Sequence, residues 1–364
     1  MKPIHTLQVP ENREGMGNMS ILRKFYKTIA ATGQPIVVSL LLIACQATTY
    51  TDATNVATVQ RLTVPEAEYR DVAWLDEDTI AFVYRLPEFG DQAGDFRIAT
   101  YILSNHVWQD IPRPELPDNC SHAPAMPHDL NLLPNSNLGY TLPCSNLHDG
   151  ISGMLYEWDR EANVFHQLQS YDPPFAIGPY AFAPDMSQLI QEERVGAGLN
   201  NELYRVNRNG EMTRLFPDYQ RARSPSWSPD GELIAFSATE TYPKRTNDPK
   251  IWGQIEDLLF YPWDLYLMNA DGSDVRILLP EAGRPYQLKW SPDSQFLAYA
   301  GDSQDSKGLW ILDIDSLELV RVWPENTFYD WSPDGTQMVV IAQEKEGDVT
   351  KTYPVIIDLT LPGP

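Results

Sequence analysis

A short motif recurs along the chain and constrains its fold more than any other feature. Its clearest copies read Trp-Ser-Pro-Asp and lead into an apolar stretch. Counted by their first residue, the strong and weak copies are six: Trp74, Leu132, Phe182, Trp227, Trp290 and Trp331. The steps between them are 58, 50, 45, 63 and 41 residues, which bracket the period of a four-stranded propeller blade. The motif therefore predicts an all-β chain built from six similar units.

Each copy predicts a strand, a tight turn and a returning strand. The strand ends in the large aromatic residue, which we expect to pack between neighbouring units. Proline then fixes φ, aspartate bonds its own backbone, and glycine takes the left-handed dihedral. We therefore assign Asp230, Asp293 and Asp334 to turn geometry, because they recur in separate units and should lie far apart. Carboxylates paired across a central channel remain an alternative.

The motif and the strands that follow it, such as residues 264–273 and 308–315, resemble the repeat of TolB-like, or WD40-like, propellers. The resemblance covers roughly residues 58–360. It implies a six-bladed β-propeller of four-stranded antiparallel blades over residues 58–364. Proteins of that family are periplasmic interaction modules, so the resemblance also implies a role outside the cytoplasm, in binding a protein or an envelope component.

The sixth unit contains only three strands before the sequence ends, while a strand-like segment stands ahead of the first unit. Residues 59–65 read like the outer strand of a blade, and residues 213–217 have a similar pattern. Closing a propeller into a ring removes exposed strand edges. We therefore predict that the N-terminal strand completes the sixth blade.

The first 45 residues have the order of a secretory signal, in which basic residues precede a short apolar run at 35–44. The run ends in Leu-Ile-Ala-Cys, which resembles the lipobox of bacterial lipoproteins and implies a lipid on Cys45. An ordinary signal peptide is the alternative. Residues 46–57 begin with a polar, Thr-rich tract and are expected to form a flexible tether. The propeller would then be held at the cell membrane or the outer membrane.

Two further cysteines, Cys120 and Cys144, flank strands of the second unit. In an oxidising compartment we expect them to form a disulfide that staples this least regular blade. Zinc is the alternative, because three histidines lie nearby in the sequence, but their spacing matches no familiar zinc pattern. We therefore expect neither a metal nor a cofactor.

The largest departure from the repeat is an insert between the second and third strands of the fourth unit, over residues 238–263. The first unit has a smaller insert at the same joint, over 86–95. Both should emerge on one face of the disc, together with the loops between blades, and this face is the expected binding face. The insert contains four aromatic residues that suit a contact surface: Trp252, Phe260, Tyr261 and Trp263. Filling the loop's own small core is the alternative.

The net charge of −23, with no basic stripe, argues against nucleic-acid binding, which requires neutralisation of phosphates. Neither the hydrolase elbow nor a phosphate-binding glycine loop is present. We therefore expect a monomeric, non-enzymatic lipoprotein that binds a protein or an envelope component. The alternative is a small-molecule-binding or glycan-binding protein, or a lyase or hydrolase, that works in the central channel. Convergent His, Arg and carboxylate groups in the channel would favour that alternative.

Overall fold

The computed structural model describes residues 51–52, 56–87, 96–114, 126–146, 150–169, 176–195, 200–215, 221–239, 263–301, 307–347 and 349–361, and near some strand ends only their backbone. This part of the chain consists of strands joined by turns. It contains no helix long and apolar enough to cross a membrane.

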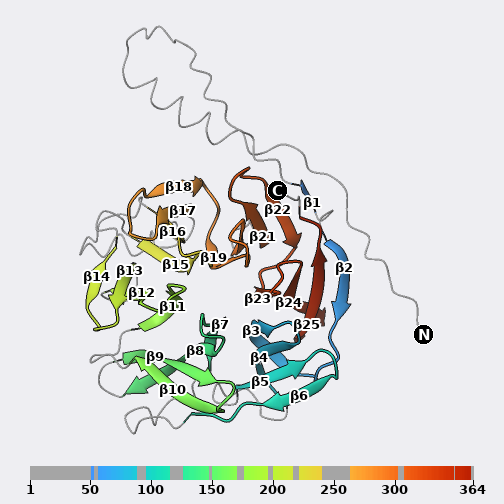
Figure 1. Ribbon diagram of the computed structural model, residues 1–364. Coiled ribbons are helices and arrows are strands. Elements are labelled where there is room, and N and C mark those ends of the chain that lie inside the picture. The colour runs from blue at the N-terminus through green and yellow to red at the C-terminus, as the bar shows by residue number, and fades with distance from the viewer. Residues whose placement is uncertain are drawn as a thin grey trace, which may run out of the picture. The chain divides into compact units, whose positions relative to one another are not determined.

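Six blades of four antiparallel strands stand around a central channel, and the short strand β1 (Thr51–Asp52) adds a fifth strand to the sheet of the fifth blade (Figure 1). The strands of each blade are given from the channel outward. The first blade has β3 (Glu68–Asp76), β4 (Thr79–Arg85), β5 (Arg97–Ile102) and β6 (Val107–Asp110), and the second has β7 (His128–Leu132), β8 (Leu138–Asn146), β9 (Gly150–Asp159) and β10 (Val164–Gln169). The third has β11 (Ala176–Phe182), β12 (Gln188–Val195), β13 (Asn200–Asn207) and β14 (Met212–Arg214), and the fourth has β15 (Arg221–Trp227), β16 (Leu233–Thr239), β17 (Asp264–Asn269) and β18 (Arg276–Leu279). The fifth has β19 (Pro285–Trp290), β20 (Phe296–Gly301), β21 (Gly308–Asp313) and β22 (Leu319–Trp323), and the sixth has β23 (Tyr329–Trp331), β24 (Gln337–Glu346), β25 (Val349–Leu359) and β2 (Val56–Arg61). The predicted six-bladed propeller is confirmed.

An N-terminal strand closes the ring, as predicted. Strand β2 pairs antiparallel with β25, with Val59 opposite Ile357. The ladder begins at Val56, inside the segment expected to be a tether. The short strand β1 (Thr51–Asp52) lies in the same segment and pairs parallel with β22, the outer strand of the fifth blade. Blade six is therefore assembled from both ends of the propeller sequence, which ties the first blade to the last.

The hydrophobic core is divided among the contacts between blades. Among the described residues the buried apolar side chains form six clusters, and each cluster joins two adjacent blades. The aromatic residues that mark the repeat belong to these clusters: Trp74, Trp227, Trp290 and Trp331 are buried, and Phe182 packs partly buried between the second and third blades. The prediction that these rings pack between neighbouring units is confirmed.

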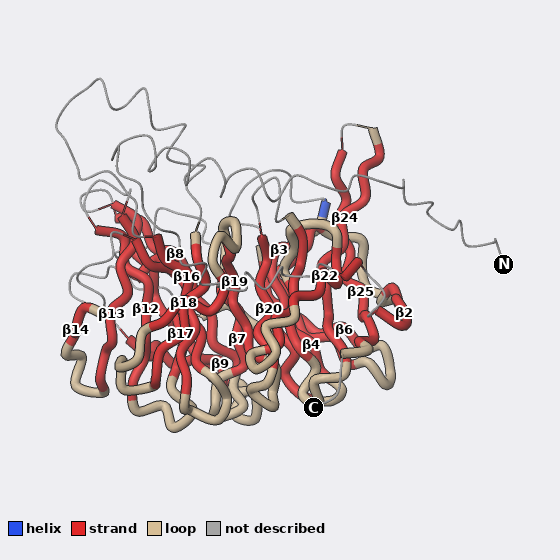
Figure 2. Tube along the Cα trace, turned by 90° about the horizontal axis from the view of Figure 1, so that it is seen from above, coloured by secondary structure: helices blue, strands red, loops and turns tan. Residues whose placement is uncertain are grey.

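The turns after the innermost strands of the fourth, fifth and sixth blades share one hydrogen-bond pattern. In the fourth blade the Ser228 hydroxyl donates to Asp230 at 2.6 Å and accepts the Leu233 N–H at 2.9 Å. The fifth and sixth blades repeat both bonds around Asp293 and Asp334. Gly231 takes φ +79°, which is why glycine suits this place in the turn. These turns lie on one face of the disc, which we call the turn face (Figure 2).

Candidate functional site at the turn face of the channel

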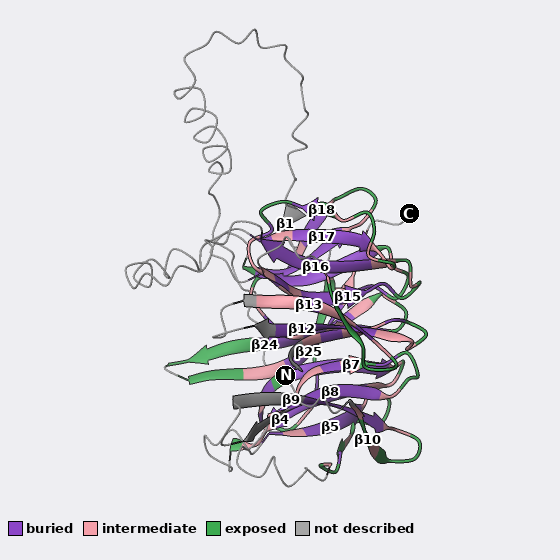
Figure 3. Cartoon of the chain, turned by 90° about the vertical axis from the view of Figure 1, so that its left-hand side faces the viewer, coloured by how far each residue is buried: buried purple, intermediate pink, exposed green. Residues whose placement is uncertain are grey.

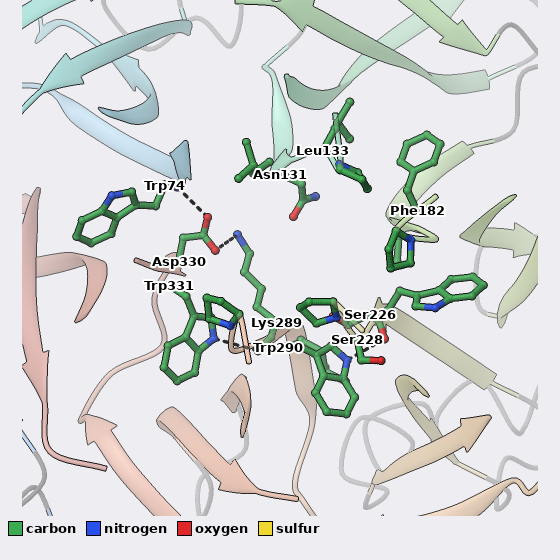
Figure 4. Close-up of a pocket in the computed structure, with 18 of the residues that line it drawn as sticks. Trp74, Asn131, Leu133, Phe182, Ser226, Ser228, Lys289, Trp290, Asp330 and Trp331 are labelled. Atoms are coloured by element: carbon green, nitrogen blue, oxygen red, sulfur yellow. Dashed lines mark hydrogen bonds and ion pairs between the residues drawn. The ribbon is translucent and has the colours of Figure 1, made fainter. Parts of the chain in front are cut away.

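A cavity of about 550 Å³ lies at the turn-face end of the channel. Its wall contains the ends of the innermost strands and the repeat tryptophans, whose labelled rings point away from the middle and in between the blades (Figure 4). Its rim is formed by a proline from five of the six turns: Pro134, Pro184, Pro229, Pro292 and Pro333. The repeat that builds the fold therefore also builds the rigid rim of a hollow.

The residue just before each repeat marker determines which side chain that blade presents to the cavity. In the six blades this position holds Ala73, Asn131, Ala181, Ser226, Lys289 and Asp330, and all but Ala73 line the cavity. Three blades have small side chains at this position, which leave space. The other three have polar side chains that point toward the middle of the cavity (Figure 4).

Lys289 and Asp330 form an ion pair inside the cavity. The Lys289 Nζ lies 3.1 Å from Asp330 Oδ1, and the two side chains are 17% and 14% exposed. The Lys289 ammonium also donates to the Leu130 carbonyl of the second blade, at 3.5 Å. The other oxygen of Asp330 accepts the Trp74 N–H of the first blade at 2.8 Å. The pair thus joins four of the six blades through groups at the channel wall.

Asn131 faces this pair from the second blade. Its side-chain amide donates to the Asp129 carbonyl at 3.0 Å and also hydrogen-bonds the Tyr180 hydroxyl, which leaves the amide oxygen for the cavity. The cavity therefore presents a cation, a carboxylate and an amide around one space. Such an arrangement can donate and accept hydrogen bonds to a small polar molecule from several sides.

A buried carboxyl lies deeper in the channel. Asp71 accepts the N–H groups of Val72 at 2.8 Å and of Leu130 at 3.0 Å. Burial raises the pKa of Asp71 to about 6, against the opposing effect of the Lys289 charge, while Asp129 raises it further. Asp71 and Lys289 therefore hold the N–H and the C=O of the same residue, Leu130.

The innermost strands carry a bulge at this depth. Register shifts occur in β7, β15 and β19, and in each of them a non-glycine residue has a left-handed backbone, with φ between 52° and 55°: Asp129, Ser224 and Gln287. Such a conformation is uncommon without glycine and is frequent where a bulge redirects a side chain near a functional site. Beside the bulge of β15, Glu192 is buried and accepts the Ser224 N–H at 3.0 Å. Burial raises the pKa of this carboxyl.

Five of the predicted site residues lie outside the described part of the chain. These are Cys45, Cys120, Trp252, Phe260 and Tyr261. Cys144 lies in β8 opposite Ser152, and its side chain is not described. Trp263 is 4% exposed and its ring lies 4.4 Å from the Arg223 guanidinium. No group of three or more His, Cys, Asp and Glu side chains in the described residues is arranged to hold a metal.

The strand that leads into the large insert ends away from the cavity. Thr239, within the expected insert but still the last residue of β16, pairs with Arg221 at the start of β15, whereas the cavity lies beyond Trp227 at the end of β15. The expected binding face is therefore not the face that holds the cavity.

Comparison with known proteins establishes the fold. No protein-family model matches the sequence, and no curated protein matches it significantly. The crystal structure of TolB from Acinetobacter baumannii matches with a TM-score of 0.54 and 15% identity, over 77% of this chain and 63% of that one. This chain thus spans less than two thirds of that TolB. It has the TolB-like propeller fold.

Two solved structures described as enzymes also match this chain in fold. A gluconolactonase from Xanthomonas campestris matches with a TM-score of 0.52 and 12% identity, over 85% of this chain and 92% of that one. A luciferin-regenerating enzyme matches with a TM-score of 0.50 and 12% identity, over 83% and 95%. The expectation of a non-enzymatic protein was therefore wrong, since it rested on the absence of familiar motifs and this architecture also occurs in enzymes.

The cavity residues were not predicted from the sequence, although a signal for them exists. Lys289 and Asp330 stand next to Trp290 and Trp331, two of the strongest repeat markers. Where other blades have alanine or serine, these two have charges. Comparing the units position by position, instead of looking for inserts between them, would have identified both residues.

Proposed function

We propose that this propeller binds a small polar molecule in the cavity at the turn face of its channel. The observation that carries the proposal is the convergence of Lys289, Asp330 and Asn131 from three blades on one space of about 550 Å³. Ligand pockets usually have volumes of about 300–1,000 Å³ and place a few polar groups in a largely apolar wall. This cavity has both properties.

The stability of the fold does not explain the ion pair. Equivalent positions in the first, third and fourth blades hold Ala73, Ala181 and Ser226, so the repeat needs no charge there. Removing a lysine and a carboxylate from water costs several kcal/mol per ion before their attraction is counted. A pair retained at such a position is better explained by what it binds.

Catalysis in the cavity is part of this proposal. The Asp330 carboxylate can accept a proton, and the Lys289 ammonium can stabilise negative charge that develops on a bound molecule. The gluconolactonase and the luciferin-regenerating enzyme support this reading only through the shared fold, because their identity to this chain is 12%.

A membrane-anchored location outside the cytoplasm completes the proposal. It is supported by the basic–apolar order of the first 45 residues, by the lipobox-like ending at Cys45 and by the pair Cys120 and Cys144. Mass spectrometry of the mature protein tests it, with an acylated N-terminal Cys45 as the expected result. An unmodified cysteine, or a mature chain cut elsewhere, would contradict the anchor.

A binding experiment tests the cavity. A panel of sugars, sugar acids, amino acids, nucleosides and blocked peptides is presented to the full chain and scanned by ligand-observed NMR and thermal shift. We expect at least one class to bind, and Lys289→Met to weaken it while Lys307→Met, a matched change at an exposed lysine, does not. Absence of any binding, or equal binding by both variants, would contradict the proposal.

One observation favours a second function, protein binding at the opposite face. Strands β24 and β25 extend beyond their blade as a two-stranded ribbon, exposed over residues 343–347 and 349–351 (Figure 3). A two-stranded ribbon is at best marginally stable alone in water, so its projection suits contact with a partner. Pull-downs with residues 343–352 shortened to a tight turn, and separately with 240–262 deleted, test this. Full retention of every captured protein in both variants would contradict it.

A further inference from the structure

The charges that line the cavity cancel each other. Among the described lining residues Lys289 is the single cation and Asp330 the single anion, and they pair at 3.1 Å. Each is also held by the backbone of another blade, Lys289 by the Leu130 carbonyl and Asp330 by the Trp74 N–H. A charged ligand would have to displace one member of a pair that is fixed on both sides. The cavity is therefore better suited to a neutral ligand that adds to the pair without breaking it.

The unused hydrogen-bonding capacity of the pair has a definite pattern. Lys289 has three N–H donors, and two of them point to Asp330 and Leu130. The Asp330 carboxylate has about four acceptor sites, of which Lys289 and the Trp74 N–H use two. The free donor and the free acceptors thus lie on neighbouring groups. A ligand that fits both must accept and donate through neighbouring atoms.

We propose that the cavity recognises the vicinal diol of a neutral, polyhydroxylated ring such as a sugar or a cyclitol. One hydroxyl accepts from Lys289 while both hydroxyls donate to Asp330, because a hydroxyl is donor and acceptor at once. The amide oxygen of Asn131, on the facing wall, can accept a hydrogen bond from a hydroxyl on the far side of the same ring. The small side chains of Ala181 and Ser226 leave the space that the ring would occupy.

A carboxamide also has a donor beside an acceptor, so an amide ligand is the rival. It would satisfy the Lys289–Asp330 pair through a single group and leave Asn131 without a partner across the cavity. A polyhydroxylated ring has hydroxyls on several edges and matches polar groups that come from blades two, five and six. The spread of these groups around the channel therefore favours the polyol.

This inference rests on the proposed function, and the experiment separates the two. Methyl α-D-mannopyranoside, methyl α-D-galactopyranoside and myo-inositol are compared with singly deoxygenated analogues and with N-acetylalanine methylamide. Binding to the full chain is measured by saturation-transfer NMR titration. We expect the intact polyols to bind and loss of one diol hydroxyl to weaken binding at least about tenfold, since hydrogen bonds to charged groups are worth about 1.5–3 kcal/mol.

Variants locate the effect in the cavity. Lys289→Met and Asp330→Asn should each weaken polyol binding about tenfold or more, and the exposed changes Lys307→Met and Asp315→Asn should not. Thermal unfolding confirms that each variant is folded, and Asn131→Leu supplies a third cavity variant if one of the others is not. Binding of the amide, or of a charged member of the broader panel, in place of the polyols overturns the diol inference but leaves the cavity site. Binding of nothing overturns both.

Discussion

Carboxyl groups at the turn face and carboxyl groups deeper in the channel have pKa values shifted in opposite directions. At the turn face, Asp334 accepts the Ser332 hydroxyl and the Thr336 N–H, and these hydrogen bonds lower its pKa. Deeper in the channel, Asp71 and Glu192 are fully buried, and burial raises their pKa values. The turn face is built from repeated, self-satisfied motifs. The deeper part holds buried acids on bulged strands.

This contrast separates the residues that make the fold from those that depart from it. The Ser-Pro-Asp turns recur because each satisfies its own polar groups locally. Lys289, Asp330 and Asp71 do not recur, and each bonds to another blade. In a repeat protein such departures are where a specific function can be placed without disturbing the architecture.

The first prediction has the largest expected effect and concerns the stability of the closed ring, on which the turn face and the deeper part of the channel both depend. Internal deletion of residues 48–61 removes β1 and β2, whereas deletion of 48–52 removes β1 alone. We expect the longer deletion to abolish cooperative unfolding or to lower the Tm by more than about ten degrees, because β25 loses its partner and the sixth blade becomes an edge. The shorter deletion breaks only a two-residue pairing and should change the Tm little. Similar Tm values for the two deletions would show that β2 does not close the ring.

Most of the fold could be predicted because its determinants are local and repeated. A strand, an aromatic residue and a Pro-Asp turn follow one another in sequence, so six markers predict six blades. The closing strand was predictable because the sixth unit lacked a strand. The parallel pairing of Thr51–Asp52 with β22 was not, because two residues carry no periodic signal.

The candidate site could be predicted only in part, because its contacts are not local. Lys289 reaches a carbonyl 159 residues away in the sequence, and this contact exists only once the ring is closed. The sequence does show that charges replace small residues before Trp290 and Trp331. It does not show that Asn131, from the most degenerate copy of the motif, faces the same cavity.

The second prediction concerns pH and the buried acid. The raised pKa of Asp71, about 6 against an unfolded value near 3.9, means that the folded state holds this proton more tightly. Its stabilisation is fully present below pH 4 and is lost as the pH rises through about 6. We therefore expect the wild type to lose on the order of 2 kcal/mol more unfolding free energy between pH 4 and 7 than Asp71→Asn, which cannot titrate.

The turn-face carboxylate provides the matched control for this measurement. The pKa of Asp334 is lowered, so its contribution is present at neutral pH and is lost as the pH falls. Its loss falls below the unfolded pKa of about 3.9, so urea unfolding of Asp334→Asn is extended from pH 4 down to about pH 2.5, where the difference from the wild type should have the opposite trend. Trends of the same sign for the two variants would contradict the distinction between the two ends.

The smallest effect concerns the four tryptophans around the cavity, which differ in one hydrogen bond. The indole N–H of Trp290 donates to the Ser226 carbonyl, and that of Trp331 to the Lys289 carbonyl, both at 3.1 Å. In the described residues the buried indole N–H groups of Trp74 and Trp227 have no partner. A change to phenylalanine removes similar ring volume at each site, but only at 290 and 331 does it also remove a hydrogen bond to the neighbouring blade. We expect those two variants to lose about 1 kcal/mol more unfolding free energy in urea than the variants at 74 and 227. Equal losses at all four would mean that packing alone, and not this bond between blades, holds the rings around the cavity.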